Sequence, residues 1–237
     1  MLEIINYSKK YHNGRLAVDN LSLSIESKDL FAFIGHNGAG KSTTIKSIVG
    51  ILPFEDGDII IDGVSIKNDP VLCKKKIAYI PDNPDLYDSL TGISYLNFIS
   101  DVFEVSREER MKIIEKYATL FGIKDDLNNY IGSYSHGMKQ KLAIISALVH
   151  KPKLIIMDEP FVGLDPIASH SVKEVMREFC DNGGAIFFST HVLEVAEKLC
   201  NKIAIIKEGK LIVSGNMEDV TKNASLEDVF LELSNHE

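Results

Sequence analysis

The first eighty residues alternate between short apolar runs and polar turns, as in a domain built on strands. Apolar and polar positions alternate over Val18–Ile25, which predicts a half-buried strand. Leu30–Ile34 is a continuous apolar run followed by glycines, which predicts a buried strand that enters a loop. Helical spacing follows over Lys41–Val49, and two further strands are expected at Asp58–Asp62 and Ile77–Ile80.

The strand signal fades between residues 91 and 127, where apolar residues recur at helical spacing. Ser106 followed by Glu109 forms a capping box, which marks the start of a second helix. We therefore expect a helical subdomain at residues 91–130, inserted into a single domain that spans residues 1–237. Two apolar stripes define its helices: Leu96, Ile99 and Phe103, then Ile113, Tyr117 and Leu120.

Strands and helices alternate again from residue 154 onward. Such alternation predicts a mainly parallel sheet flanked by helices. A hairpin that turns at Glu208–Gly209 and a short helix at Leu226–Leu233 are expected to end the chain. The strands are expected at Leu154–Met157, Ala185–Ser189 and Lys202–Ile206, and the helices at Ile167–Phe179 and Val192–Leu199.

A glycine-rich segment follows the first buried strand and matches the phosphate-binding pattern G-x-x-x-x-G-K-[ST] at every fixed position. Its glycines let the backbone curl, so that N–H groups and the N-terminus of the next helix hold phosphate oxygens. Lys41 is expected to reach the β- and γ-phosphates, and the Ser42 hydroxyl is expected to bind Mg²⁺. The candidate nucleotide-binding residues here are Gly35, His36, Asn37, Gly38, Ala39, Gly40, Lys41, Ser42 and Thr43.

Two adjacent carboxylates follow the apolar strand at Leu154–Met157. Open α/β sheets bind ligands beyond the carboxyl ends of their strands, where the glycine-rich loop also emerges. Asp158 is therefore a candidate for the Mg²⁺ shell. Glu159 is a candidate general base that polarises an attacking water.

Composition narrows the range of functions. The 237 residues are 45% hydrophobic and 25% charged, which is typical of a globular domain with a substantial core. The net charge of −8 disfavours a nucleic-acid partner, and we expect none. Cys73, Cys180 and Cys200 form no metal-type pair, so we expect small buried hydrophobic residues in a reducing compartment. The longest apolar stretch, Leu142–Val149, is too short to span a bilayer.

Together these motifs resemble the ATP-binding subunits of ABC transporters over nearly the whole chain. The segment Tyr134–Lys141 is similar to the signature of that family, usually Leu-Ser-Gly-Gly-Gln, at the start of its helix. His136 and Met138 stand where the family usually has glycine and glutamine. Ser135 and Gly137 are retained, and the resemblance implies that they contact the γ-phosphate held by an opposite subunit. The implied fold is an α/β P-loop NTPase core with a mainly parallel sheet, an antiparallel β subdomain and an inserted α-helical subdomain.

The resemblance also assigns roles to four other places in the chain. The segment Gly163–Pro166 is similar to the loop at the dimer interface. His191 corresponds to the histidine that contacts the γ-phosphate, and Tyr11 to the aromatic residue that stacks on adenine. Asp82 occupies the position of a glutamine near the metal, and our hypothesis is that it remains a residue of the Mg²⁺ shell.

The resemblance implies an ATPase that works as a pair. A single chain carries one set of motifs, so a homodimer, or a heterodimer with a second ABC ATPase, closes over ATP and Mg²⁺. The helical subdomain passes this motion to a separate membrane permease, which places the chain on the cytoplasmic face of the cell membrane. The ending Ser225–Leu233 resembles that of short subunits often found in export.

Three alternatives stay open at this point. A GTPase or small-molecule kinase also carries a phosphate loop, but a guanine-reading Asn-Lys-x-Asp is missing, because Ile203 and Ala204 follow Asn201–Lys202. An ABC ATPase of DNA repair or translation would carry long coiled-coil insertions or two ATPase units. A nucleotide sensor without turnover would not need Glu159 and His191.

Overall fold

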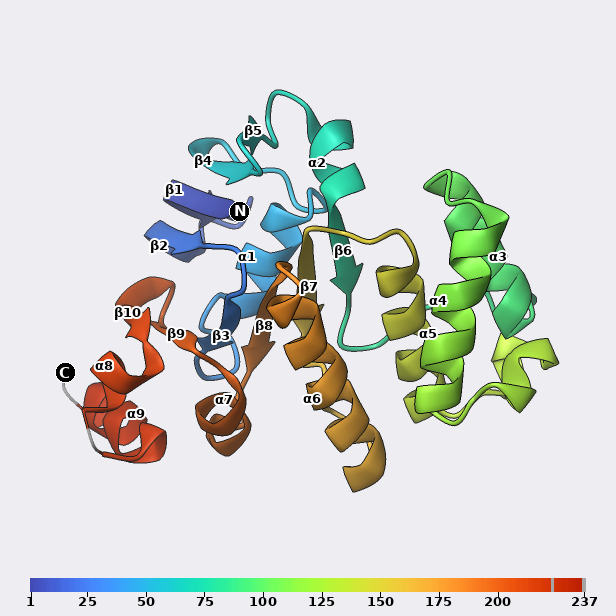
Figure 1. Ribbon diagram of the computed structural model, residues 1–237. Helices are drawn as coiled ribbons and strands as arrows, with labels where there is room; N and C mark the ends of the chain where they lie inside the picture. The colour runs from blue at the N-terminus through green and yellow to red at the C-terminus, as the bar shows by residue number, and fades with distance from the viewer. Residues whose placement is uncertain (223, 236–237) are drawn as a thin grey trace.

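The computed structural model describes residues 1–222 and 224–235, which form two β-sheets surrounded by helices (Figure 1). Positions 223, 236 and 237 of the expected domain lie outside the described residues. None of the helices in the described part reaches the length and apolarity needed to cross a lipid bilayer.

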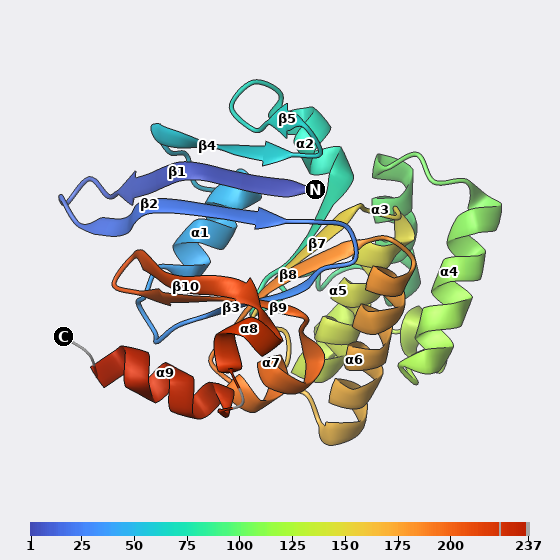
Figure 2. The same ribbon diagram turned by 60° about the vertical axis from the view of Figure 1, so that its left-hand side comes forward.

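The smaller sheet is antiparallel and contains the N-terminus of the chain (Figure 2). Its strand at residues 2–10 is not among the elements that the sequence pattern predicts. Asn6 has a left-handed φ of 46°, and the pairing register shifts around it, so the apolar alternation breaks after Ile4. The strand order across the sheet is β2 (Leu16–Ile25), β1 (Leu2–Lys10), β4 (Asp56–Ile61) and β5 (Val64–Ser65).

The larger sheet is mainly parallel, and the expected strands are confirmed within a residue or two at their ends. Only its edge strand, β10, pairs antiparallel to its neighbour, through the hairpin expected at Glu208–Gly209. The order is β10 (Lys210–Asn216), β9 (Lys202–Lys207), β3 (Leu30–Ile34), β8 (Ala185–Thr190), β7 (Leu154–Asp158) and β6 (Ile77–Ile80). The predicted fold class is confirmed.

The helices fall into three groups around the sheets. One group lies around the large sheet: α1 (Lys41–Ile48), α2 (Pro70–Lys76), α6 (Pro166–Asp181) and α7 (Leu193–Leu199). A second stands to one side (Figure 1): α3 (Gly92–Val102), α4 (Arg107–Leu120), α5 (His136–Val149) and the 3₁₀ turns η1 (Asp125–Asn128) and η2 (Ile131–Ser133). The third ends the chain: α8 (Met217–Thr221) and α9 (Leu226–Asn235).

One expected apolar stripe is partly wrong. On α4 the buried residues are Ile114 and Ala118, Ile113 and Tyr117 are half-buried, and Leu120 is 43% exposed. The helix packs against both α3 and α5, so its buried face is centred one residue further along than a single-sided stripe would be. The capping box is confirmed, since the Ser106 hydroxyl accepts a hydrogen bond from the Glu109 amide.

Two apolar cores fix the position of the phosphate loop. One lies between the sheets, where Phe33 of β3, Phe187 of β8 and Ile45 of α1 are fully buried. Because each such side chain contributes about 1.5–3 kcal/mol on burial, α1 is anchored tightly under the loop. The other core joins the far face of the large sheet to α5 and α6. The three cysteines are free and buried, as expected.

Candidate functional site

The glycine-rich segment forms a tight loop between β3 and α1. A Cβ atom on Gly35 would lie 2.4 Å from the Ile206 carbonyl oxygen, so only glycine fits there. Gly40 has a φ of +109°, and a Cβ on it would lie 2.6 Å from the Ala17 carbonyl oxygen. Glycine at these two positions therefore lets the loop pack closely against β9 and β2, with the N-terminus of α1 at its end.

Lys41 is buried at the first position of α1, with a side chain 6% exposed. Its Nζ donates a hydrogen bond of 2.7 Å to the Gly35 carbonyl oxygen. The same atom lies 3.8 Å from Oε1 of Glu159. Burial lowers the pKa of Lys41, while the carboxylates of Glu159 and Asp158 act in the opposite direction. Lys41 is thus a cation in a partly desolvated pocket that also contains the carboxylates of Asp158 and Glu159.

The two acids come from the end of β7, and β8 lies between that strand and β3. Ser189 of β8 is fully buried and joins the acids, because its hydroxyl donates to Oδ1 of Asp158 and accepts from the Glu159 amide. Glu159 has a left-handed φ of 48°, a conformation that costs free energy for a residue with a Cβ atom. Strain of this kind is concentrated where structure serves function.

His191 completes a row of three groups at the edge of the sheet. Its Nδ1 lies 3.0 Å from Oε2 of Glu159, whose other oxygen faces Lys41. The side chain of His191 is about half exposed, while that of Glu159 is 15% exposed. The carboxylate is therefore held between a buried cation and an imidazole, and one face of the histidine stays open to solvent.

A pocket of about 440 Å³ brings most of the predicted residues together. Tyr11 lies at its rim, and its hydroxyl is 3.1 Å from that of Thr43. Asp82, from the loop after β6, faces the same space as Ser42 and Asp158. The lining residues are Tyr11, Arg15, Ala17, Asn37, Gly38, Gly40, Lys41, Ser42, Thr43, Asp82, Asp158 and Glu159.

The donor set on one side of this pocket consists of oxygens, which suits Mg²⁺. Ser42 offers a hydroxyl, and Asp82 and Asp158 offer carboxylates. No group of three His, Cys, Asp or Glu side chains that could hold a metal occurs in residues 1–222 and 224–235. Mg²⁺ usually binds through one or two carboxylates together with substrate phosphates, so the residues present fit a shared ion.

Six predicted residues are not among the described residues that line the pocket: Gly35, His36, Ala39, Ser135, Gly137 and His191. Ser135 and Gly137 begin α5. The Ser135 hydroxyl caps the helix by accepting from the Met138 amide, and a Cβ on Gly137 would lie 3.7 Å from the carbonyl oxygen of Gly163. The His36 ring packs on Phe230 of α9, with centroids 4.9 Å apart, so its main chain is the part that belongs to the loop.

Sequence reasoning missed three residues of the site. Ser189 links the acids but sits inside an apolar strand without a motif of its own. Arg15 and Ala17 line the pocket from β2 and the turn before it. The signal for this hairpin was present as Asn13–Gly14, a favoured hairpin turn between the two strands.

The chain matches a known protein family over more than half of its length. A family model described as "ABC transporter" matches residues 18–162. An uncharacterized ABC transporter ATP-binding protein of Bacillus subtilis, YhcH, is 37% identical over 221 residues, covering 92% of this chain and 71% of its own. The ABC-type transporter ATP-binding protein EcsA of the same organism is 34% identical, covering 91% of this chain and 89% of its own.

Solved structures give the same result. An ATP-binding subunit of an ABC transporter superposes with a TM-score of 0.95 at 33% identity, covering 99% of this chain and all of the other. A second is cbiO1 from Clostridium perfringens, described as part of the ABC transporter complex cbiONQ. It superposes with a TM-score of 0.82 at 25% identity, covering 98% of this chain and 95% of the other.

Proposed function

This chain belongs to the ABC transporter family as a subunit that binds and hydrolyses ATP, and from that premise we propose that two copies close over ATP to drive a separate membrane permease. One observation carries the proposal. Glu159 and Lys41 line the pocket beside the phosphate loop, with Lys41 Nζ 3.8 Å from one oxygen of the Glu159 carboxylate, and His191 lies 3.0 Å from the other oxygen. A catalytic carboxylate, a phosphate-binding cation and a histidine are thereby assembled on three neighbouring strand ends.

Nucleotide binding follows from the loop and the hairpin beside it. Backbone N–H groups of the glycine-rich loop and the N-terminus of α1 hold the phosphates, and Lys41 binds the terminal ones. Tyr11, 37% exposed at the rim, stacks on adenine. Mg²⁺, held by Ser42, Asp158 and Asp82 together with the phosphates, would supply neutralisation of the charge on the triphosphate.

Hydrolysis is carried by Glu159 and its neighbours. The carboxylate accepts a proton from a water whose oxygen attacks the γ-phosphorus, and the bond from that phosphorus to the ADP oxygen breaks. His191 orients the carboxylate through Oε2 and presents its open face to the γ-phosphate. The Ser189 hydroxyl accepts a hydrogen bond from the Glu159 amide and donates one to Asp158, which keeps both acids at the end of β7 during the reaction.

Dimer closure accounts for Ser135 and Gly137, two of the predicted residues that do not line the pocket. Ser135 and Gly137 begin α5 next to Gly163 and are not among the described residues that line the chain's own pocket. A second copy, or a homologous ATPase, supplies its own α5 N-terminus to the γ-phosphate in this pocket. Helix N-termini favour anions, so closure adds attraction where phosphate charge is greatest.

The permease is the partner that the helical region serves. Within the domain of residues 1–237, the subdomain at residues 91–130 would bind the permease. Large apolar side chains are exposed there and in the loop before it: Tyr87 is 58% exposed, Phe98 45% and Val102 57%. Apolar groups gathered on one surface mark contact sites for other proteins. The chain would then reside at the cytoplasmic face of the cell membrane, bound to the permease.

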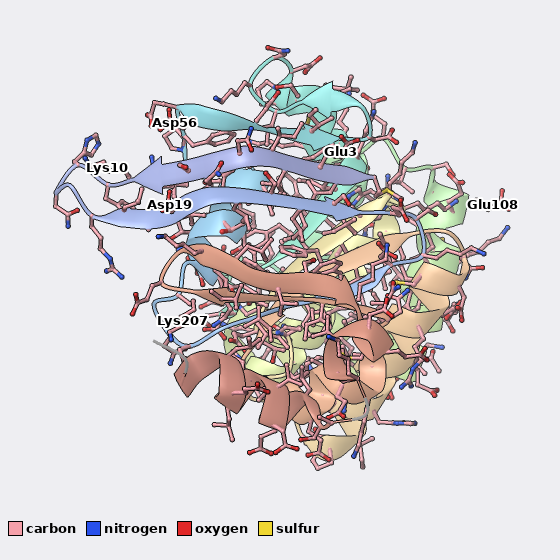
Figure 3. All side chains as sticks on the ribbon, turned by 90° about the vertical axis from the view of Figure 1, so that its left-hand side faces the viewer. Glu3, Lys10, Asp19, Asp56, Glu108 and Lys207 are labelled. Carbon is pink, nitrogen blue, oxygen red and sulfur yellow. The ribbon has the colours of Figure 1, made fainter. Side chains whose placement is uncertain are left out.

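A Glu159→Gln variant tests hydrolysis and closure together. It keeps the size of the side chain but removes the proton acceptor, so we expect ATP binding with turnover slowed by about a hundredfold or more. Light scattering with size-exclusion chromatography should show a dimer with ATP and a monomer without it. Glu108→Gln is the control and should behave as wild type, because Glu108 is an exposed acid on α4 (Figure 3) that forms an ion pair with the neighbouring Lys112.

Two results would contradict the proposal at different levels. A wild-type chain that neither binds nor hydrolyses ATP would remove the assigned pocket. A Glu159→Gln chain that binds ATP yet stays monomeric at every concentration would remove dimer closure alone.

A further inference from the structure

Two cationic side chains line the nucleotide pocket, and they differ in their burial and in the partners they already have. Lys41 is buried, hydrogen-bonded to the Gly35 carbonyl and next to Glu159, so its charge is already partly neutralised within the protein. Arg15 is exposed, and no ion pair between described residues involves it. Its Nη2 lies 3.8 Å from the position that a Cβ atom would take on Gly38, in the middle of the phosphate loop.

The β1–β2 turn fixes where Arg15 stands relative to Tyr11. The Tyr11 amide donates to the Arg15 carbonyl oxygen at 2.9 Å, and the Gly14 amide donates to the Tyr11 carbonyl oxygen at 2.9 Å. The Arg15 amide donates to the Asn13 side chain at 3.1 Å, and Gly14 takes a φ of +84° that suits glycine. The two side chains therefore enter one pocket from the two ends of a closed turn.

The charges in the pocket show what this arginine can bind. Asp82, Asp158 and Glu159 give the described lining residues three carboxylates against the two cations. A triphosphate adds further negative charge in the same space. Arginine presents several N–H donors in a planar fork that matches phosphate oxygens, and it keeps its charge at every relevant pH.

We propose that Arg15 is a nucleotide-binding residue, which clamps the phosphate chain against the Gly38 side of the loop while Tyr11 holds the base. This inference rests on the proposed function, because it needs ATP in this pocket. The β1–β2 hairpin then contacts both ends of ATP: Tyr11 contacts the adenine, and Arg15 contacts the phosphates. Binding should depend on salt through this exposed cation more than through the buried Lys41.

Arg15→Ala tests the inference, because it leaves in place the backbone bonds that shape the turn. We expect the Kd for Mg·ATP and Mg·ADP, measured by titration calorimetry, to rise about tenfold. The salt dependence of Kd should become weaker, and Arg15→Lys should recover part of the affinity. Lys10→Ala is the matched control, because Lys10 is an exposed cation at the same turn (Figure 3) outside the pocket lining, and its Kd should equal that of wild type.

Lys41→Ala, measured in parallel, separates this inference from the proposed function. If Lys41→Ala weakens ATP binding while Arg15→Ala binds as tightly as wild type, Arg15 is only a surface residue and the inference is overturned. An equal loss in Arg15→Ala and Lys10→Ala would also overturn it, because the effect would then be general surface charge. If the wild-type chain binds no ATP, the proposed function fails first.

Discussion

Replacing Ser189 by alanine isolates the one buried hydroxyl that joins the two acids. Ser189 is fully buried, and Asp158 is 6% exposed, so solvent replaces neither lost bond readily. Removing a donor from a buried carboxylate costs about 1.5–3 kcal/mol. For a domain of this length, that loss lowers Tm by roughly 3–12 °C. The Glu159 amide keeps its bond of 3.2 Å to the Ser189 carbonyl oxygen, so the backbone turn should survive.

The effect on turnover should exceed what stability alone explains. Asp158 loses its fixed orientation and the Glu159 amide loses a partner, and small displacements of catalytic groups cost up to about a hundredfold in rate. We expect kcat for ATP hydrolysis to fall about tenfold or more at a temperature where the variant is fully folded. KM for ATP should change less, because Lys41 and the phosphate loop are untouched.

Ser47→Ala is the matched control for this experiment. Ser47 of α1 is also fully buried, and its hydroxyl shares a bond of 2.7 Å with that of Tyr7, away from the acids. Both variants should lower Tm in thermal unfolding, but only Ser189→Ala should lower kcat. Equal kcat values in the two variants would refute the reasoning, because the hydroxyl would then serve the fold and not the acids.

Two further variants test the metal shell and the packing of the helical region. Asp82→Asn should raise the Mg²⁺ concentration for half-maximal ATPase activity about tenfold or more. If this Mg²⁺ concentration is unchanged, Asp82 does not belong to the metal shell. His150 stacks on Phe103 with centroids 3.8 Å apart, and burial lowers its pKa below the ordinary 6.5, so the unfolded chain takes up the proton first. The free energy of unfolding, measured in urea, should therefore fall as pH drops below about 6.5, and less so in His150→Gln; equal losses in both proteins would exclude His150 as the cause.

Particular elements show where pattern reasoning succeeds and fails. The buried run Leu30–Ile34 and the glycine loop after it were predicted because both depend on neighbours in sequence. The first strand was not predicted, because the bulge at Asn6 moves its apolar positions to the other phase halfway along. Leu120 was assigned to the wrong face, because the packing of α4 against two other helices sets which side is buried.

Sequence by itself determined the local chemistry of this protein: a phosphate loop, a strand ending in two acids and a serine-capped helix. Each depends on a few consecutive residues, whose conformations follow from glycine freedom, capping and apolar spacing. Tertiary structure decided which groups meet. Ser189 reaches Asp158 because the strand order places β8 beside β7. Arg15 lies near Gly38 because the small sheet packs on the large one, which brings the β1–β2 turn to the loop. Contacts between residues far apart in sequence depend on the packing of whole sheets, which no local pattern encodes.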